Sequence, residues 1–272
     1  MGLTMSKTEL QTSAGLLALI EANAPFWAAE AEVIRSYWDA PIRNVETDKK
    51  WLTHQVYKEF WDGVLPPLAL FNENLPRAGA QSGRMKLVEL AEVLYEEVEH
   101  FTLFADLFLV LDGNDYQLST DELKEAGAWP ENDALMTMRQ SHISETTELG
   151  QRAFRLTEGG YCALFTEGMK LAGRNDFDSA VAEVCRKIYE DEFNHMLLGI
   201  IEADNNHLSE KDWEVLLGYT VAQSKQRVVM RNAQFSFPVT DGRIDELLAG
   251  KATPVIFDFD YAAQLLDDQG AH

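Results

Sequence analysis

A helical stripe of apolar residues that includes a carboxylate and an imidazole is the feature that most constrains this chain. Between residues 84 and 111 the stripe recurs at alternating spacings of three and four residues, which predicts a helix with one face packed on other helices. Its members are Leu87, Leu90, Leu94, Glu97, Phe101, Phe104 and Phe108. His100 projects from the same side as Glu97, one turn later. Because an unpaired buried carboxylate is costly or becomes protonated, a metal ion is one of the few partners that would keep Glu97 charged.

A second predicted helix, over residues 178–203, repeats this pattern. Its seam consists of Val181, Cys185, Ile188, Glu192, His195 and Gly199, so Glu192 and His195 form a second E-x-x-H pair. The remaining histidines lack a glutamate three residues earlier and are expected to be surface or singly hydrogen-bonded groups; they are His54, His142, His207 and His272. Two E-x-x-H helices indicate a four-helix site for two metal ions, which needs one further carboxylate from each of two other helices.

The third carboxylate is predicted by counting from a loop between antiparallel helices. Residues equally far from the loop lie opposite each other, because each helical residue rises about 1.5 Å. With a turn near residue 175, Glu192 points to Glu158. Glu158 also belongs to a helical stripe, which consists of Phe154, Glu158, Tyr161, Phe165 and Met169. Glu167 is the rival candidate, although it falls on another face and closer to the loop.

The fourth carboxylate comes from the same kind of count. With a loop near residue 78, Glu97 points to Glu59, which follows Leu52 and Val56 on one helix face. Nearby prolines leave the geometry of this helix open. The alternatives at this position are Glu46, His54 and Asp62.

The predicted metal ligands are Glu59, Glu97, His100, Glu158, Glu192 and His195, with Glu97 and Glu158 bridging two ions. Four carboxylates neutralise two divalent ions, and one imidazole for each ion suits iron or manganese better than calcium. Glu96 and Asp191 directly precede the two motif glutamates. Each is expected to accept a hydrogen bond from the ligating histidine of the facing helix and so to orient its ring.

Helical periodicity dominates the rest of the chain, which predicts an all-α fold class. We expect a single domain over residues 1–272, with the metal-binding core at 45–204, an N-terminal helix at 8–39, and a C-terminal helix and tail at 208–272. A short helix capped by Ser119 is predicted, as is a long one from Pro130 to about Ala172. Prolines and glycines after Asp62 predict a kink or short turn and then a loop ending near Ser82.

The charge of the chain limits its partners. With 23 basic and 45 acidic residues the formal charge is -22, which disfavours nucleic acid and anionic membrane surfaces. The two cysteines, Cys162 and Cys185, lie in helical patterns, and no signal-like or membrane-spanning apolar run appears. We therefore expect a cytoplasmic, reduced protein.

The order of the predicted ligands resembles that of the ferritin-like diiron-carboxylate superfamily. It is carried by Glu59, "EEVEH", Glu158 and "DEFNH", with separations of 38, 61 and 34 residues that are similar to those of the oxygenase members. The resemblance covers about residues 45–204 and implies a ferritin-like four-helix bundle with additional flanking helices. A competing family, the haem-oxygenase-like diiron oxidases, has another histidine seven residues before the last one, where this chain has Ile188.

The resemblance implies an enzyme that binds two iron ions, or iron with manganese, and activates O2. Such an enzyme would hydroxylate, N-oxygenate or desaturate a small organic substrate with electrons from a donor protein or reductant, and a homodimer is compatible with it. A ferroxidase-type iron-handling protein is an alternative. It would need only a minimal bundle, so the additional length of this chain argues against it. A radical-generating subunit is a third, for which no tyrosine is assigned.

Aromatic residues and glycines near the predicted ligands raise two further expectations. The substrate pocket is expected beside the metals, lined by Phe101, Phe104, Tyr161 and Phe165. Gly159 and Gly160 directly follow Glu158, and each costs about 1 kcal/mol relative to alanine inside a helix. They would permit a π-bulge, leave room for substrate, or allow close helix packing.

Overall fold

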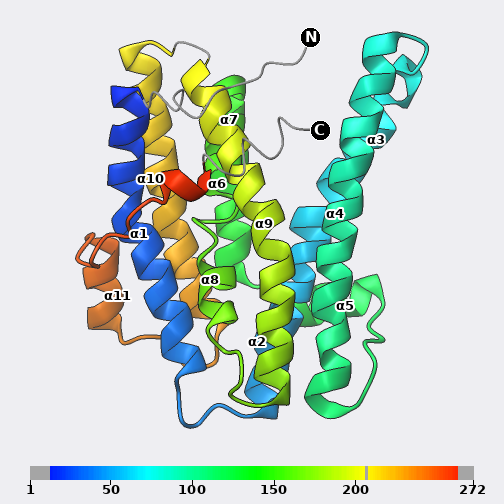
Figure 1. The fold of residues 1–272 in the computed structure, drawn as a ribbon, viewed down its shortest axis with the longest axis vertical. Helices are drawn as coiled ribbons and strands as arrows, with labels where there is room; N and C mark the ends of the chain where they lie inside the picture. The colour runs from blue at the N-terminus through cyan, green and yellow to red at the C-terminus, as the bar shows by residue number, and fades with distance from the viewer. Residues whose placement is uncertain (1–12, 206–207, 263–272) are drawn as a thin grey trace.

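The chain folds into helices joined by short connections (Figure 1). The computed structural model describes residues 13–205 and 208–262, and these contain helices and no β-strand, which confirms the all-α fold class. The elements are α1 (Ala14–Trp38), α2 (Val45–Lys58), the π-helix η1 (Glu59–Val64), α3 (Leu65–Asn74), the 3₁₀ turn η2 (Leu75–Arg77), α4 (Gln81–Asp112), α5 (Thr120–Gly127), α6 (Pro130–Glu145), α7 (Thr147–Thr157), α8 (Ala163–Met169), α9 (Asp176–Asn205), α10 (Glu210–Gln234) and α11 (Asp241–Leu248).

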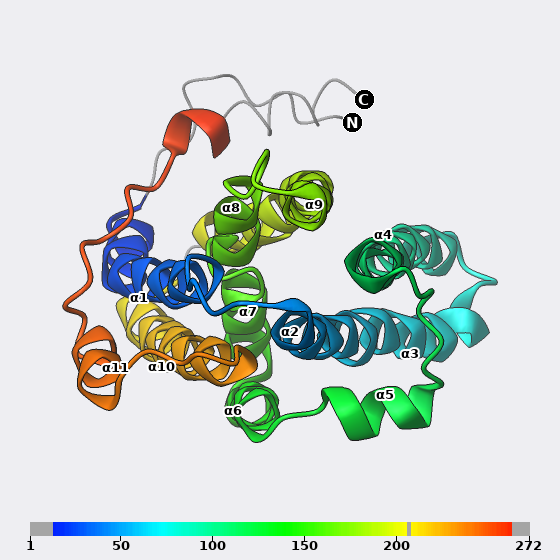
Figure 2. The same cartoon turned by 90° about the horizontal axis from the view of Figure 1, so that it is seen from below.

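Four helical segments carry the predicted ligands: α2 with its continuation η1, α4, α7 and α9. Seen along their axes in Figure 2, they surround a common interior, in which α4 contacts α2, η1 and α9, and α9 contacts α7. Outside this group, α1 and α10 pack side by side, α10 contacts α6 and α7, and α1 contacts α8. Of the six ligand candidates, Glu59, Glu97, His100 and Glu192 are buried between these helices, and Glu158 and His195 are half-buried.

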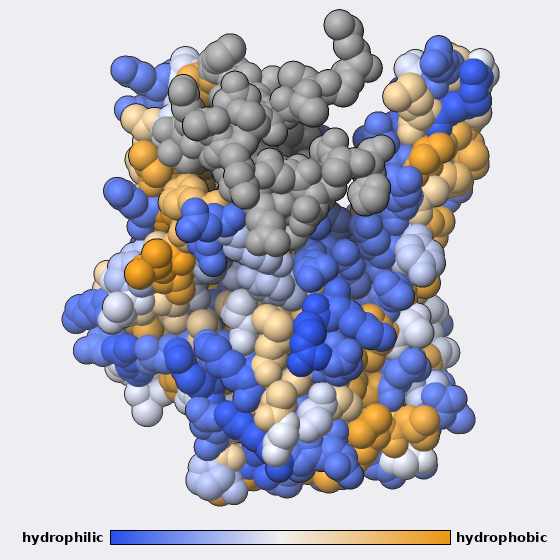
Figure 3. Space-filling view, in the orientation of Figure 1, coloured by the Kyte–Doolittle hydropathy of each residue, from blue (hydrophilic) through white to orange (hydrophobic). Residues whose placement is uncertain are grey.

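The surface is mostly polar, with an apolar exception along one side. Figure 3 shows hydrophilic side chains over much of the visible face, and hydrophobic ones at several places, including the α3–α4 hairpin that stands to one side of the other helices. Exposed apolar residues of this hairpin include Leu70, Met85, Val88 and Tyr95. None of the helices in the described part of the chain combines the length and apolar composition needed to cross a bilayer.

Helix capping follows the sequence signals. Ser119 caps α5, with its hydroxyl accepting from Glu122 N–H and the Glu122 side chain accepting from Ser119 N–H. Ser209 and Asp212 form the same capping box at the start of α10, and Pro130 is the first residue of α6. The predicted helix at 8–39 begins at Ala14 in the structure, and residues 8–12 lie outside the described part of the chain.

The predicted long helix from Pro130 to Ala172 is wrong. Thr146 has an extended backbone, with φ -145° and ψ 94°, and separates α6 from α7. A turn at residues 158–162 then separates α7 from α8. Periodicity remains helical through these breaks because the apolar residues on both sides still face the same core, so the pattern alone does not reveal them.

The prediction of a kink or short turn after Asp62 and then a loop ending near Ser82 is partly right. The next helix, α4, does begin close to Ser82, at Gln81, but residues 65–74 before it are helical. The helix continues through the wider π-turn η1 into α3, where Pro66 and Pro67 lie in the first turn. Leu65 N–H donates to Phe60 O, five residues earlier. Because prolines lack an N–H and their rings clash with the carbonyl four residues back, a π-turn before them keeps the helix continuous without that clash.

Candidate metal centre

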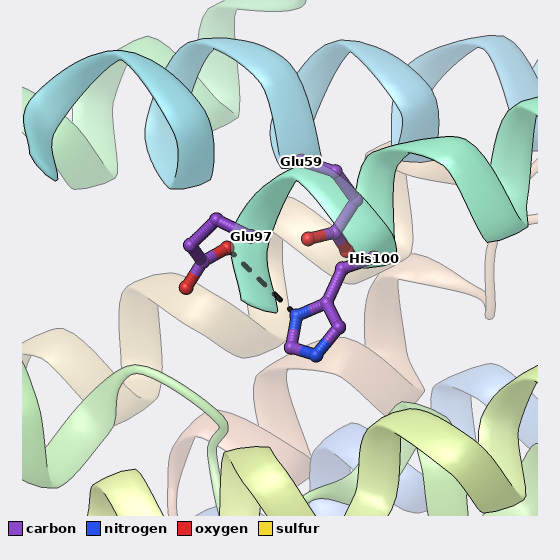
Figure 4. Close-up of side chains that lie close together, drawn as sticks. All are labelled: Glu59, Glu97 and His100. Atoms are coloured by element: carbon purple, nitrogen blue, oxygen red, sulfur yellow. Dashed lines mark ion pairs between the residues drawn. The ribbon is translucent and has the colours of Figure 1, made fainter. Parts of the chain in front are cut away.

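Glu59, Glu97 and His100 form the first cluster of the site (Figure 4). Each side chain offers one ligand atom, and these atoms lie within 4.8 Å of one another. All three residues are buried. His100 Nδ1 lies 3.8 Å from Glu97 Oε2. Since metal–ligand bonds in proteins are about 2.0–2.6 Å long, donors this close together can share one ion.

The π-turn η1 brings Glu59 to this cluster. Gln55, one turn earlier on α2, donates a hydrogen bond to Glu59 Oε1 and fixes the carboxylate. Gly63 lies at the other end of η1, where a Cβ would overlap Glu97 Oε2 and lie 3.8 Å from Glu59 Oε2. This glycine therefore leaves the space that both carboxylates use, a role that the sequence analysis missed.

Glu192, His195 and Glu158, the remaining ligand candidates, lie on α9 and at the end of α7. Glu192 Oε1 lies 3.8 Å from His100 Nδ1, as close as Glu97 Oε2. Glu192 is therefore adjacent to the first cluster. The negative charges of Glu158 and Glu192 both act on His195 and on Glu97. The bridging role of Glu97 and Glu158 stays a prediction.

Both histidines are held by carboxylates of the facing helix. His100 Nε2 lies 3.2 Å from Asp191 Oδ2, and His195 Nε2 lies 3.1 Å from Glu96 Oε2. These contacts join α4 and α9 in both directions. They leave His100 Nδ1 buried without a hydrogen-bond partner among the described residues, directed at two carboxylates. A donor nitrogen in this position fits a metal ion better than any protein group nearby.

The electrostatics of the site favour an added cation. Burial, together with the negative charges of Glu192, Glu158 and Glu59, raises the pKa of Glu97 to about 8. Burial acts to lower the pKa of the His100 ring, but its bond to Asp191 and the surrounding glutamates outweigh this and raise the pKa to about 9. Protons are thus held tightly here, and a divalent ion would displace them.

The same balance applies to the second histidine. Burial acts to lower the pKa of His195, but the hydrogen bond to Glu96 and the charges of Glu192, Glu158 and Glu97 raise it to about 10. Both E-x-x-H pairs therefore experience a strongly negative environment. This is the field that a pair of divalent cations would neutralise.

Helix α7 ends at the third ligand candidate. Its last residue is Thr157, and Glu158 occupies the C-cap. The next residues interrupt the right-handed helix, because Gly160, Tyr161 and Cys162 have positive φ angles of 54°, 53° and 54°. Positive φ is unfavourable for residues other than glycine, so the surrounding packing must hold this turn. The structure contains a left-handed turn here, not the π-bulge considered for Gly159 and Gly160.

Close packing accounts for both of these glycines. A Cβ on Gly160 would overlap the Arg227 guanidinium and the Glu30 carboxylate. A Cβ on Gly159 would lie 3.4 Å from Glu192 Oε2, close to the ligand itself. The turn therefore brings backbone, rather than side chains, against two charged groups.

A buried polar network lies behind the site, and the sequence analysis did not identify it. Arg227 donates to Glu30 through Nε at 3.0 Å and Nη2 at 2.7 Å, and through Nη1 to Glu158 O at 2.5 Å. Arg231 donates to Glu30 at 2.9 Å and to Gln55 at 3.0 Å. Burial acts to raise the pKa of Glu30, but the two arginines outweigh it and lower this pKa below the ordinary value. The sequence signal for this network was the pair Arg227 and Arg231, which are four residues apart and therefore share one face of a helix.

The rival ligands lie elsewhere. Glu167 is buried but pairs with Lys170 at 2.7 Å and lies 3.8 Å from Arg35. His54 Nδ1 lies 2.8 Å from Gly127 O. Asp62 accepts from Asn132 at 2.9 Å, and Glu46 is an exposed residue beside Lys49. None of the four belongs to the cluster around His100 in the described structure.

The four aromatic residues expected around a substrate pocket do not share one environment. Phe101 packs against Phe60, with ring centroids 5.3 Å apart, while Phe104 and Phe165 are buried in the hydrophobic core. Tyr161 instead stacks on Trp27 at 5.1 Å, and its hydroxyl accepts from Asp258 N–H at 2.9 Å. Tyr161 therefore anchors the C-terminal segment, and its assignment to the pocket lacks support from these contacts.

Comparison of the chain with protein-family models, with curated proteins and with solved structures finds no match.

Proposed function

We propose that this chain is a non-haem, two-metal oxidoreductase of the ferritin-like diiron-carboxylate type, which activates O2 to oxidise a small organic molecule. The observation that carries the proposal is the unpartnered His100 Nδ1, buried between Glu97 and Glu192. A single ion would account for the first cluster. The second E-x-x-H pair, its bond to Glu96 and the adjacent Glu158 supply a second set of donors.

The residues divide into terminal and shared ligands. Glu59 and His100 would hold one ion, and Glu158 and His195 the other. Glu97 and Glu192 would lie between the ions, since both approach His100 Nδ1 to 3.8 Å. Four carboxylates and two imidazoles suit iron or manganese, and two such ions would supply the electrons and open positions needed for reaction with O2.

The protein's own contribution is to orient these donors and exclude water. Asp191 and Glu96 hold the Nε2 side of each ring and leave Nδ1 for the metal. Phe104 and Ile188 are fully buried on the same two helices. These side chains cover the site with apolar groups, which strengthens its electrostatic interactions.

The proposal is tested by loading the purified protein with ferrous iron under anaerobic conditions, counting the metal, and then measuring O2 uptake. We expect two irons per chain and rapid O2 uptake. Glu167→Ala, which removes a buried carboxylate outside the site, is the matched control and should bind two irons as well. Zero or one iron with no O2 uptake would contradict the proposal. Uptake that ends when the iron is oxidised, and that no organic compound in a substrate panel extends, would favour iron handling instead.

A further inference from the structure

The last two carbonyls before the turn at Glu158 are held by two arginines from helices that carry no ligand. A helix leaves its final carbonyls without intrahelical donors and has a partial negative charge at that end. Here the helix ends at a ligand candidate, and the residues that follow have positive φ. The position of Glu158 therefore depends on groups outside α7.

Arg227, on α10, holds the carbonyl of Glu158 itself. Its Nη1 donates to Glu158 O at 2.5 Å, while Nε and Nη2 are fixed by both oxygens of Glu30. The Arg227 side chain is 1% exposed. Because the guanidinium is planar and bound bidentately to Glu30, the direction of its third bond is set by α1 and α10.

Arg139, on α6, holds the preceding carbonyl. Its Nη2 donates to Thr157 O at 2.9 Å and to Thr157 Oγ1 at 3.3 Å. The guanidinium lies over the Phe154 ring, 4.4 Å from its centroid. Burial and the charge of Arg227 lower the pKa of Arg139 to about 10, and the charge of Glu158 opposes that change.

We infer that Arg139 and Arg227 are positioning residues for the second metal ion: they fix the C-terminal end of α7 and thereby aim Glu158 at His195. The inference rests on the proposed two-metal function. Neither arginine touches the ligand atoms of the first cluster, which depends on Gln55 and η1 instead. Removing either arginine should therefore lower the affinity for one ion and leave the affinity for the other unchanged.

The experiment is a titration of the full-length protein with Mn²⁺ by calorimetry and equilibrium dialysis, because Mn²⁺ binding needs no turnover. Wild type is compared with Arg139→Gln, Arg227→Gln and Arg139→Lys. Glu158→Ala serves as the reference for losing the second ion. Arg43→Gln is the matched control, because Arg43 is a largely buried arginine paired with Asp48 and Asp178. Asp178 lies about 21 Å along α9 from Glu192. Melting temperatures are measured in parallel.

We expect the two glutamine variants to lower the affinity of one ion by about 10- to 100-fold and to leave the other within a factor of two. Arg139→Lys should restore most of the loss, because an ammonium can still donate to Thr157 O. Arg43→Gln should lower the melting temperature without changing either affinity. If Arg227→Gln fails to fold, the comparison of Arg139→Gln with Arg139→Lys tests the inference by itself.

If the Arg139 and Arg227 variants lower both affinities equally, or change neither, the inference is overturned while the two-metal site stands. Wild-type protein that binds fewer than two Mn²⁺ ions would overturn the proposed function and this inference together.

Discussion

The two sides of the site are built in different ways. On the helical side, Glu59, Glu97 and His100 project from continuous helical backbone, and Gln55 and Gly63, which adjoin Glu59, lie one turn from it in sequence. On the turn side, which comprises Glu158 and the turn at residues 159–162, the backbone leaves the helix at the ligand candidate. Arg139 and Arg227 hold this backbone from 18 and 69 positions away in sequence. The backbone of the helical side is set by helix formation, whereas that of the turn side depends on contacts with other helices.

This difference predicts which substitutions lower metal affinity and which lower the stability of the fold. A ligand shared by both sides should affect both ions. A change on the helical side should alter metal binding more than folding, and a change on the turn side should alter both.

The largest effect is expected for Glu97→Ala. Glu97 belongs to the first cluster and its charge also acts on His195, so its loss should abolish stoichiometric binding of both ions. His195→Ala should likewise prevent stoichiometric loading. Metal analysis after anaerobic iron loading measures the loss, and circular dichroism should show largely unchanged helical content. Two metals per chain in either variant would remove that residue from the ligand set.

Two glycine substitutions separate the sides most clearly. Gly160→Ala places a Cβ against Arg227 and Glu30 at a φ of 54°, and should destabilise the protein by about 2–4 kcal/mol. Gly63→Ala meets the end of the Glu97 side chain inside a helical turn, so it should leave stability nearly unchanged and weaken metal binding. Denaturant unfolding and Mn²⁺ titration of both variants test this contrast, which fails if Gly63→Ala is the more destabilising.

The pH dependence of stability is the next effect. The folded pKa values of Glu97, His100 and His195, about 8, 9 and 10, lie above the ordinary values of 4.5, 6.5 and 6.5. The folded state thus binds these protons more tightly, so their stabilising effect is complete at low pH and is lost as pH rises through the folded values. Between pH 7 and pH 9, the free energy of unfolding of chelator-treated protein should fall by about 1.4 kcal/mol per pH unit for each proton that the folded state binds in excess of the unfolded state.

Metal affinity should change in the opposite direction over the same interval. Because the ligands must lose these protons, Mn²⁺ should bind more tightly at pH 8 than at pH 6.5. Urea unfolding and Mn²⁺ titration at each pH provide the measurements. A chelator-treated protein that gains stability from pH 7 to pH 9 would show that the carboxylates and imidazoles do not share one buried field.

The smallest effect is expected for Asp191→Asn and Glu96→Gln. Each replaces the carboxylate that accepts from a ligating histidine, and should lower the affinity of one ion by about tenfold. Asp191→Asn should act on the ion at His100, and Glu96→Gln on the ion at His195. Stepwise Mn²⁺ affinities distinguish the two, and identical effects on both ions would mean that the rings are not held separately.

The sequence predicted the helical side better than the turn side. Glu97, His100, Glu192 and His195 stand out because a polar residue in an apolar stripe is visible in a single helix, and Glu59 follows from counting along antiparallel helices. The all-α class followed from the same periodicity. Continuation of the helix past Asp62 was missed because prolines usually end a helix, and here a π-turn precedes them.

The turn side depends on contacts that no local pattern contains. The stripe through Glu158, Tyr161 and Phe165 has helical spacing, yet a left-handed turn interrupts the helix between them. Counting from the loop placed Glu158 opposite Glu192, but it did not reveal that Glu192 lies as close to His100 as Glu97 does. Arg227 lies 197 residues from Glu30 in sequence, so their pairing follows only from the assembled fold.

The central claim, two ions held by six side chains from four helical segments, is tested most directly by an anomalous difference map of a crystal soaked with Mn²⁺. We predict two peaks per chain, one beside Glu59 and His100 and one beside Glu158 and His195, with Glu97 and Glu192 between them. A single peak at the first cluster, or none, would contradict the claim and reduce the second E-x-x-H pair to a buried polar network.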